Sequence, residues 1–145
     1  MTWWAVVRFL HVLAAALWVG GQLTVSLVVL PSARRLLDDQ RRAQLLTAVG
    51  RRFGLITVAV FLPVQLATGV AIARHKGVTW ASLAEPGYGR ILAAKLVLFC
   101  AVMVAAALHG WASGSGRRGP ARALAVSSLI GSMGVVLLAT ALPVT

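Results

Sequence analysis

Four apolar segments, each close to or above the length needed to cross a lipid bilayer, constrain the fold of this chain most strongly. They cover approximately residues 3–30, 53–73, 91–112 and 121–142. Hydrophobic residues make up 59% of the 145 residues, which is a larger share than a soluble domain can have and still cover itself with polar surface. Backbone polar groups in a bilayer must bond within the protein, which favours helices. The sequence therefore predicts an all-α fold, a four-transmembrane-helix bundle that forms a single integral membrane domain over residues 1–145.

Basic residues in the connections between these segments predict how the bundle is oriented. The first connection has Arg34, Arg35, Arg41, Arg42, Arg51 and Arg52, and the third has Arg117, Arg118 and Arg122. By the positive-inside rule both connections are cytoplasmic, so the N- and C-termini and the loop 75–89 lie outside. No Lys or Arg precedes the first apolar run, and it is too long for a signal-peptide core, so we interpret it as a retained helix. We expect a multi-pass protein of the cell membrane, plasma or inner. Its net charge of +11 is expected to serve contact with the lipid bilayer and not with nucleic acid.

Prolines predict where the first two helices end or bend. Pro31 stands where the first helix is expected to end, because proline lacks the backbone donor that a continuing helix needs. The basic segment 32–50 is then predicted to form a short interfacial helix on the inner membrane surface, with its arginines on anionic lipid headgroups. Pro63 lies in the middle of the second span and predicts a kink.

The fourth span is poor in reactive side chains and rich in small residues. Ser127, Gly131 and Gly134 share one helical face, a pattern that lets helices approach closely. We interpret this span as a packing helix. Its partner is open at this point: another helix of the bundle, a second copy in a homo-oligomer, or a larger membrane complex.

Two of the apolar segments contain cations at bilayer depth with no carboxylate beside them. The cations are Arg8 and His11 in the first segment and Lys95 and His109 in the third. On a helical wheel each set falls on one stripe, and Gln65 and Thr68 form the matching stripe of the second segment. An ionisable group in hydrocarbon is costly and normally has a partner. We therefore expect the stripes to face a common interior that takes an anionic cofactor or substrate, a lipid phosphate, or water.

Depth in the membrane separates these residues into two levels. With about 1.5 Å of rise per residue, His11 and Lys95 fall about 8–9 Å to the outer side of the midplane, and His109 about 12 Å to the inner side. His11 and His109 of one chain are then too far apart to ligate one metal ion. A haem fits the outer level, with His11 as axial ligand to the iron and with Lys95 and Arg8 near the propionates.

The same residues also have ordinary structural interpretations. The two long basic side chains lie close to helix ends and can extend to the lipid headgroups. His11 can equally be a core histidine bonded to Gln65, Thr68 or a water molecule. His109, at the inner boundary, fits an interfacial packing role as well as a functional one.

A copper site built from soft ligands is the chemical alternative to haem. Cys100, Met103 and Met133 lie near the midplane and suit Cu(I). On the wheel, however, Cys100 and Met103 lie away from the stripe of Lys95, which favours packing over a copper path. The single cysteine excludes an intramolecular disulfide and, without a CxxC pair, an iron–sulfur or structural zinc site.

Two stretches resemble known families of membrane proteins. Residues 8–21, RFLHVLAAALWVGG, followed by Leu30-Pro31, resemble the opening of copper-resistance-protein-D (CopD) type membrane domains. Residues 94–98, AKLVL, and the later Leu108-His109-Gly110 are similar to the third helix of the HemJ-type protoporphyrinogen oxidases. The resemblance covers residues from about 4 to 112.

The resemblance implies a function for the paired residues at the outer level. In the HemJ-type family a histidine in the first span and a lysine in the third carry function, and these roles fall on His11, as metal ligand, and Lys95, as catalytic residue. The cofactor-binding residues that we expect are His11, Lys95, Arg8, Gln65, Thr68 and His109. The expected protein binds haem b and serves electron transfer or membrane oxidation, as a haem-dependent oxidoreductase. The alternative function is copper ion transport, which the resemblance to CopD-type domains implies. The second alternative is a structural subunit of a larger membrane complex.

Overall fold

The computed structural model describes residues 2–116 and 118–141, and every regular element in these ranges is helical. The elements are, in order, α1 (Trp3–Thr24), η1 (Val25–Val29), α2 (Leu30–Leu36), α3 (Asp39–Ile56), η2 (Thr57–Phe61), α4 (Leu62–His75), η3 (Ala81–Ala84), α5 (Tyr88–Gly114) and α6 (Arg118–Ala141). Four continuous helices in the described ranges are long and apolar enough to cross a membrane: Trp3–Leu36, Asp39–His75, Tyr88–Gly114 and Gly119–Ala141. The predicted all-α fold with four membrane-spanning helices is confirmed. Arg117 and the end of the predicted fourth span, residue 142, lie outside the described residues.

The first two long helices each continue through a proline. η1 and η2 are π-helical turns, and each is followed directly by a Leu-Pro pair, Leu30-Pro31 and Leu62-Pro63. Within an α-helix the proline ring clashes with the carbonyl group one turn earlier, and a π turn at that point widens the backbone. Each proline then lies in the first turn of the next α-helical segment, where its missing donor is not needed. The prediction that the first helix ends at Pro31 is therefore wrong, because the helix continues to Leu36.

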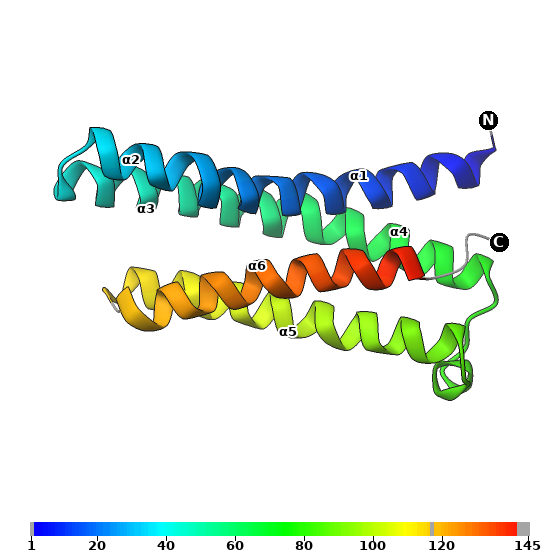
Figure 1. Ribbon diagram of the computed structural model, residues 1–145. Coiled ribbons are helices and arrows are strands. Elements are labelled where there is room, and N and C mark those ends of the chain that lie inside the picture. Colours follow the sequence, from blue (N-terminus) through cyan, green and yellow to red (C-terminus); the bar gives the residue numbers. More distant parts are fainter. Residues whose placement is uncertain (1, 117, 142–145) are drawn as a thin grey trace.

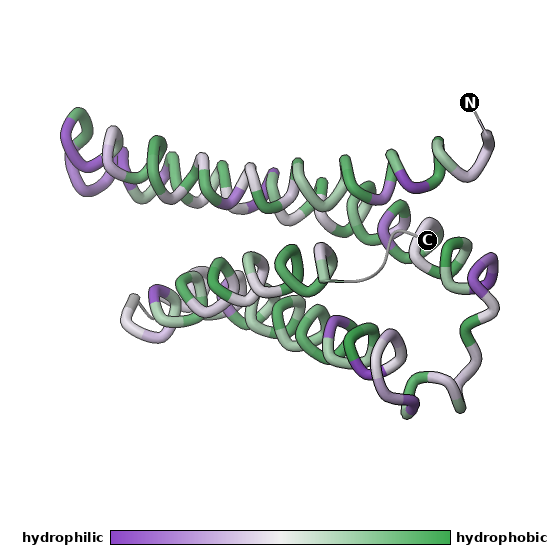
Figure 2. Tube along the Cα trace, turned by 45° about the vertical axis from the view of Figure 1, so that its right-hand side comes forward, coloured by the Kyte–Doolittle hydropathy of each residue, from purple (hydrophilic) through white to green (hydrophobic). Residues whose placement is uncertain are grey.

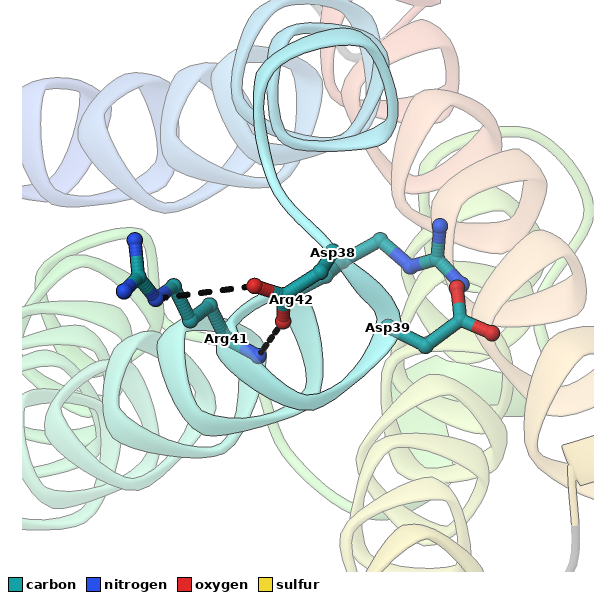
Figure 3. Close-up of polar contacts among 4 residues, drawn as sticks. All are labelled: Asp38, Asp39, Arg41 and Arg42. Carbon is teal, nitrogen blue, oxygen red and sulfur yellow. Dashed lines mark hydrogen bonds and ion pairs between the residues drawn. The ribbon is translucent and has the colours of Figure 1, made fainter.

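A two-residue connection that ends in Asp38 joins the first long helix to the second. The Asp38 carboxylate caps α3 by accepting a hydrogen bond from the backbone N–H of Arg41 at 2.8 Å. Arg41 also pairs with Asp38 at 3.5 Å, and Arg42 with Asp39 at 2.6 Å (Figure 3). The predicted single interfacial helix over 32–50 is wrong, because this cap starts a new helix at Asp39. The segment instead forms the two arms of a helical hairpin.

The long helices form two antiparallel pairs (Figure 1). α1 packs along α4, and α5 packs closely against α6. Glycines allow the second contact: a Cβ atom on Gly134 would lie 2.9 Å from Cδ2 of Leu98, and one on Gly131 would overlap the side chain of Val102. Ser127, in contrast, is exposed. The fourth span is thus a packing helix within the bundle, through its two glycines and not through Ser127.

An aromatic contact lies at the centre of the bundle. The buried core residues are Trp18, Val19, Phe61 and Val102. The ring of Trp18 stacks on Phe61 with 4.9 Å between centroids, and its indole N–H donates a hydrogen bond to Thr57 Oγ1 at 3.2 Å. This contact joins α1 to η2. Many large apolar side chains face outward instead, as expected for a bundle surrounded by lipid.

The second long helix approaches the α5–α6 pair only along its first half. α3 packs against α5, whereas α4 and α5 make no close backbone contact within the described ranges. Figure 2 shows α4 and the start of α5 apart at the end where the loop between them lies. In that loop η3 lies directly on the start of α5, where a Cβ atom on Gly89 would overlap the carbonyl oxygen of Ser82. The separation leaves a space at this end of the bundle.

Candidate functional site

A cavity of about 490 Å³ occupies the space between α4 and α5. Most of its lining side chains are apolar, and the loop contributes Val78 and Trp80 to the lining. Three of the predicted site residues line it: His11 from α1, Gln65 from α4 and Lys95 from α5. The volume lies in the range of small-molecule and cofactor sites, about 300–1,000 Å³. One residue from each predicted polar stripe thus faces a common cavity.

Hydrogen bonds hold the ring of His11 in one tautomer. Nδ1 of His11 lies 2.8 Å from Oγ1 of Thr68, and this hydroxyl lies 2.6 Å from the carbonyl oxygen of Val64. Because the hydroxyl donates its hydrogen to the carbonyl, it accepts from His11, and Nδ1 carries a hydrogen. Nε2 of His11 lies 3.2 Å from Nε2 of Gln65, an amide nitrogen that only donates. His11 is therefore a neutral imidazole that donates from Nδ1 and accepts at Nε2.

Gly69 lets the imidazole ring lie directly against the backbone of α4. A Cβ atom at this position would be 3.3 Å from Cε1 of His11, which is tighter than an ordinary van der Waals contact. Thr68 and Gln65, which hold the ring, are both buried. The polar stripe of the second span is thus joined to that of the first, and the interpretation of His11 as a histidine bonded to Gln65 and Thr68 is confirmed.

The amide of Gln65 has a polar atom that no described residue satisfies. Its Oε1 is buried and has no hydrogen-bond partner in the described part of the chain. The residue lines the large cavity and also a neighbouring void of about 20 Å³ that Ser132 lines from α6. A buried acceptor without a donor costs about 1–3 kcal/mol. A ligand or water that donates to this oxygen would stabilise the bundle.

The charged lining of the cavity is positive. Lys95 is half-buried, and Arg74 at the end of α4 is the second lining cation. None of the described residues that line the cavity is a carboxylate. The ion pairs that the structure describes lie at the hairpin, and Glu85 is an exposed loop residue. An anionic group in the cavity therefore meets two cations and no competing acid.

Three predicted site residues lie outside the cavity lining. Arg8 is an exposed residue of α1. Thr68 does not line the cavity and acts through His11. Nδ1 of His109 donates to the carbonyl oxygen of Ala121 at 2.7 Å and so joins α5 to α6. His109 therefore has the packing role that the sequence analysis gave as an alternative.

Two features of the site have almost no signal in the sequence. The loop residues Val78 and Trp80 have no helical periodicity that would assign them to a cavity. Gly69 is equally inconspicuous, since its role depends on a ring from another helix. The only available signal was the small side chain next to Thr68 in the polar stripe.

The soft ligands do not form a cluster. Cys100 and Met133 are exposed, whereas Met103 packs against the core. Across the described ranges no group of three or more His, Cys, Asp or Glu residues could hold a metal ion. The copper alternative gains no support from this arrangement.

Comparisons with known proteins give this chain no relative. No family model, no curated protein and no solved structure matches it.

Proposed function

We propose that this chain binds haem b in the cavity between α4 and α5 and serves electron transfer or substrate oxidation within the membrane. The proposal depends mainly on the tautomer and the hydrogen bonds of His11. Thr68 holds its Nδ1–H, so Nε2 is the nitrogen suited to coordinate a metal ion. Histidines that ligate metals commonly donate their other ring N–H in this way.

The residues around the cavity fit such a group in charge and polarity. Apolar walls suit a macrocycle, and Lys95 and Arg74 suit its propionates. Gln65 now donates to Nε2 of His11, so coordination at Nε2 requires the amide to give up this bond.

Haem supplies one-electron redox chemistry when bound. The chain would contribute His11 as axial ligand, Thr68 as the residue that orients the ring, and apolar walls that exclude water. Lys95 would neutralise a propionate or serve as a second ligand to the iron. The resemblance to HemJ-type oxidases makes Lys95 the proposed catalytic residue of an oxidase.

We place the protein in a cell membrane, plasma or inner, with the cavity toward the outer side. The proposal for this orientation depends on the arginines of the hairpin and the positive-inside rule. Arg34, Arg35 and Arg41 are exposed there and are suited to anionic lipid headgroups.

An absorption spectrum tests the cofactor and its ligand together. We expect protein purified in mild detergent to show a Soret band after haem supplementation, and His11→Ala to lose it. His109→Ala is the matched control, because this histidine lies outside the cavity and should leave the band unchanged. Absence of the band in the wild-type protein, or equal bands in wild type and His11→Ala, would refute haem ligation by His11.

A further inference from the structure

The cavity opens toward the side of the bundle. Its lining includes Leu66 and Val70 of α4 and Leu96 of α5, whose surfaces remain 55%, 50% and 46% exposed. All three lie within helices that are long and apolar enough to cross a membrane, which puts this side of the cavity at bilayer depth. Direct helix packing does not close this side, because the described parts of α4 and α5 make no close backbone contact.

The loop between α4 and α5 contributes to the lining at the other end of the cavity. Val78, Trp80 and Leu83 line the cavity at the end of the bundle where water would approach. The loop is held in place by the contact of Gly89 with the backbone of Ser82, which leaves no room for a side chain. The opening between α4 and α5 therefore offers a path to the cavity through the bilayer.

Charge and polarity define what can use this path. The walls are apolar, and the lining charges, Lys95 and Arg74, are positive without a carboxylate among the described lining residues. A fully apolar molecule would leave Lys95 desolvated without a partner, and a small hydrophilic anion does not dissolve in the acyl-chain region. The charge and the opening together fit an amphiphile that has an apolar body and an acidic group.

We propose that the cavity is loaded sideways, between α4 and α5, by a membrane-dissolved amphiphile whose carboxylate binds Lys95. This inference uses the cavity of the proposed function, and haem b, an apolar macrocycle with carboxylates, is one member of the class. It goes beyond that function in naming the route and the shared chemistry of the ligand.

The test uses a fluorescent fatty acid, cis-parinaric acid, and its uncharged methyl ester as probes, with the protein in lipid nanodiscs. We expect saturable binding of the acid by the wild type. Leu96→Trp, which places a large ring at the opening, should weaken this binding at least about tenfold. Val97→Trp is the matched control: Val97 is the next residue of α5, is 71% exposed and does not line the cavity. Val70→Trp repeats the test from α4.

The role of Lys95 is tested with the same probes. Lys95→Gln should weaken binding of the acid about tenfold and leave the ester unchanged, because only the acid loses a charge-assisted hydrogen bond. Non-saturable binding in the wild type, or equal losses in Leu96→Trp and Val97→Trp, would overturn the proposal. An equal effect of Lys95→Gln on acid and ester would overturn the carboxylate contact.

Haem loading separates this inference from the proposed function. Haem presented in lipid vesicles should load Leu96→Trp more slowly than Val97→Trp. A Soret band that forms equally fast in both variants would end the sideways route and leave haem binding intact. Fatty-acid binding with the expected pattern but no Soret band would end the haem proposal and support the route.

Discussion

The hydroxyl of Thr68 has one hydrogen atom, and the carbonyl group of Val64 accepts it at 2.6 Å. This leaves Thr68 as the acceptor for Nδ1–H of His11 and makes Nε2 the acceptor side of the ring. The bond from Nδ1–H of His11 to Thr68 suits both a core histidine and a metal ligand, so the two interpretations of His11 do not exclude each other. Thr68 is a positioning residue that acts on the cavity through His11.

Thr68→Val removes this acceptor with little change of shape. We expect the free energy of unfolding to fall by about 0.5–1.5 kcal/mol and haem affinity to fall about 10- to 100-fold, with Thr68→Ser close to wild type. Thr57→Val is the matched control, because Thr57 accepts from Trp18 and donates to Phe53 in the same pattern away from the main cavity. Thr57→Val should lower stability but spare affinity. Haem titrations followed at the Soret band measure the affinity of both variants. An equal loss of affinity in Thr68→Val and Thr57→Val would count against Thr68 as the residue that orients His11.

At the scale of elements, sequence predicted the helices better than their ends. The apolar segments locate all four spans because their length alone indicates a crossing. Pro31 led to a wrong helix end, because a proline usually marks a helix boundary. Here the π turn before it lets the helix continue. The glycine face of α6 was predictable, because small residues at helical spacing have few other uses in a membrane helix.

The α5–α6 contact gives a test at the same scale. Gly131→Val places a side chain against Val102, and we expect it to lower the free energy of unfolding by about 1–3 kcal/mol. Ser127→Val changes an exposed position of the same helix and should have little effect. Unfolding in mixed detergent, followed by circular dichroism, measures both. Similar stabilities of the two variants would mean that close approach of α5 and α6 at Gly131 contributes little.

At the scale of the whole molecule, the stripes predicted which helices share an interior but not the shape of that interior. His11, Gln65 and Lys95 were predictable because polar groups in an apolar segment are costly unless they face each other or a ligand. The cavity was not, since its size depends on how far α4 diverges from α5 and on a loop without periodicity. Arg8 and His109 had the right residue types, yet depth and exposure place them outside it.

The orientation of the bundle in the membrane is testable with engineered cysteines. In a Cys100→Ala background, Ala84→Cys lies in the loop next to the cavity and Gln40→Cys lies at the hairpin, and both positions are exposed. The positive-inside rule predicts that a membrane-impermeant maleimide labels Ala84→Cys in intact cells and Gln40→Cys only after permeabilisation. Mass-shift gels read out the labelling, and the reverse pattern would invert the topology.

The two helix pairs are joined by α3 on α5 and by α1 on α6, whereas α4 makes no close backbone contact with α5 within the described ranges. The position of α4 across the cavity is therefore set by its packing on α1 and by the contact of α3 with α5, and not by direct packing on α5. The width available to a guest then depends on these distant contacts as well as on the residues that touch the guest. Substitutions in the α3–α5 contact should alter guest selectivity from a distance.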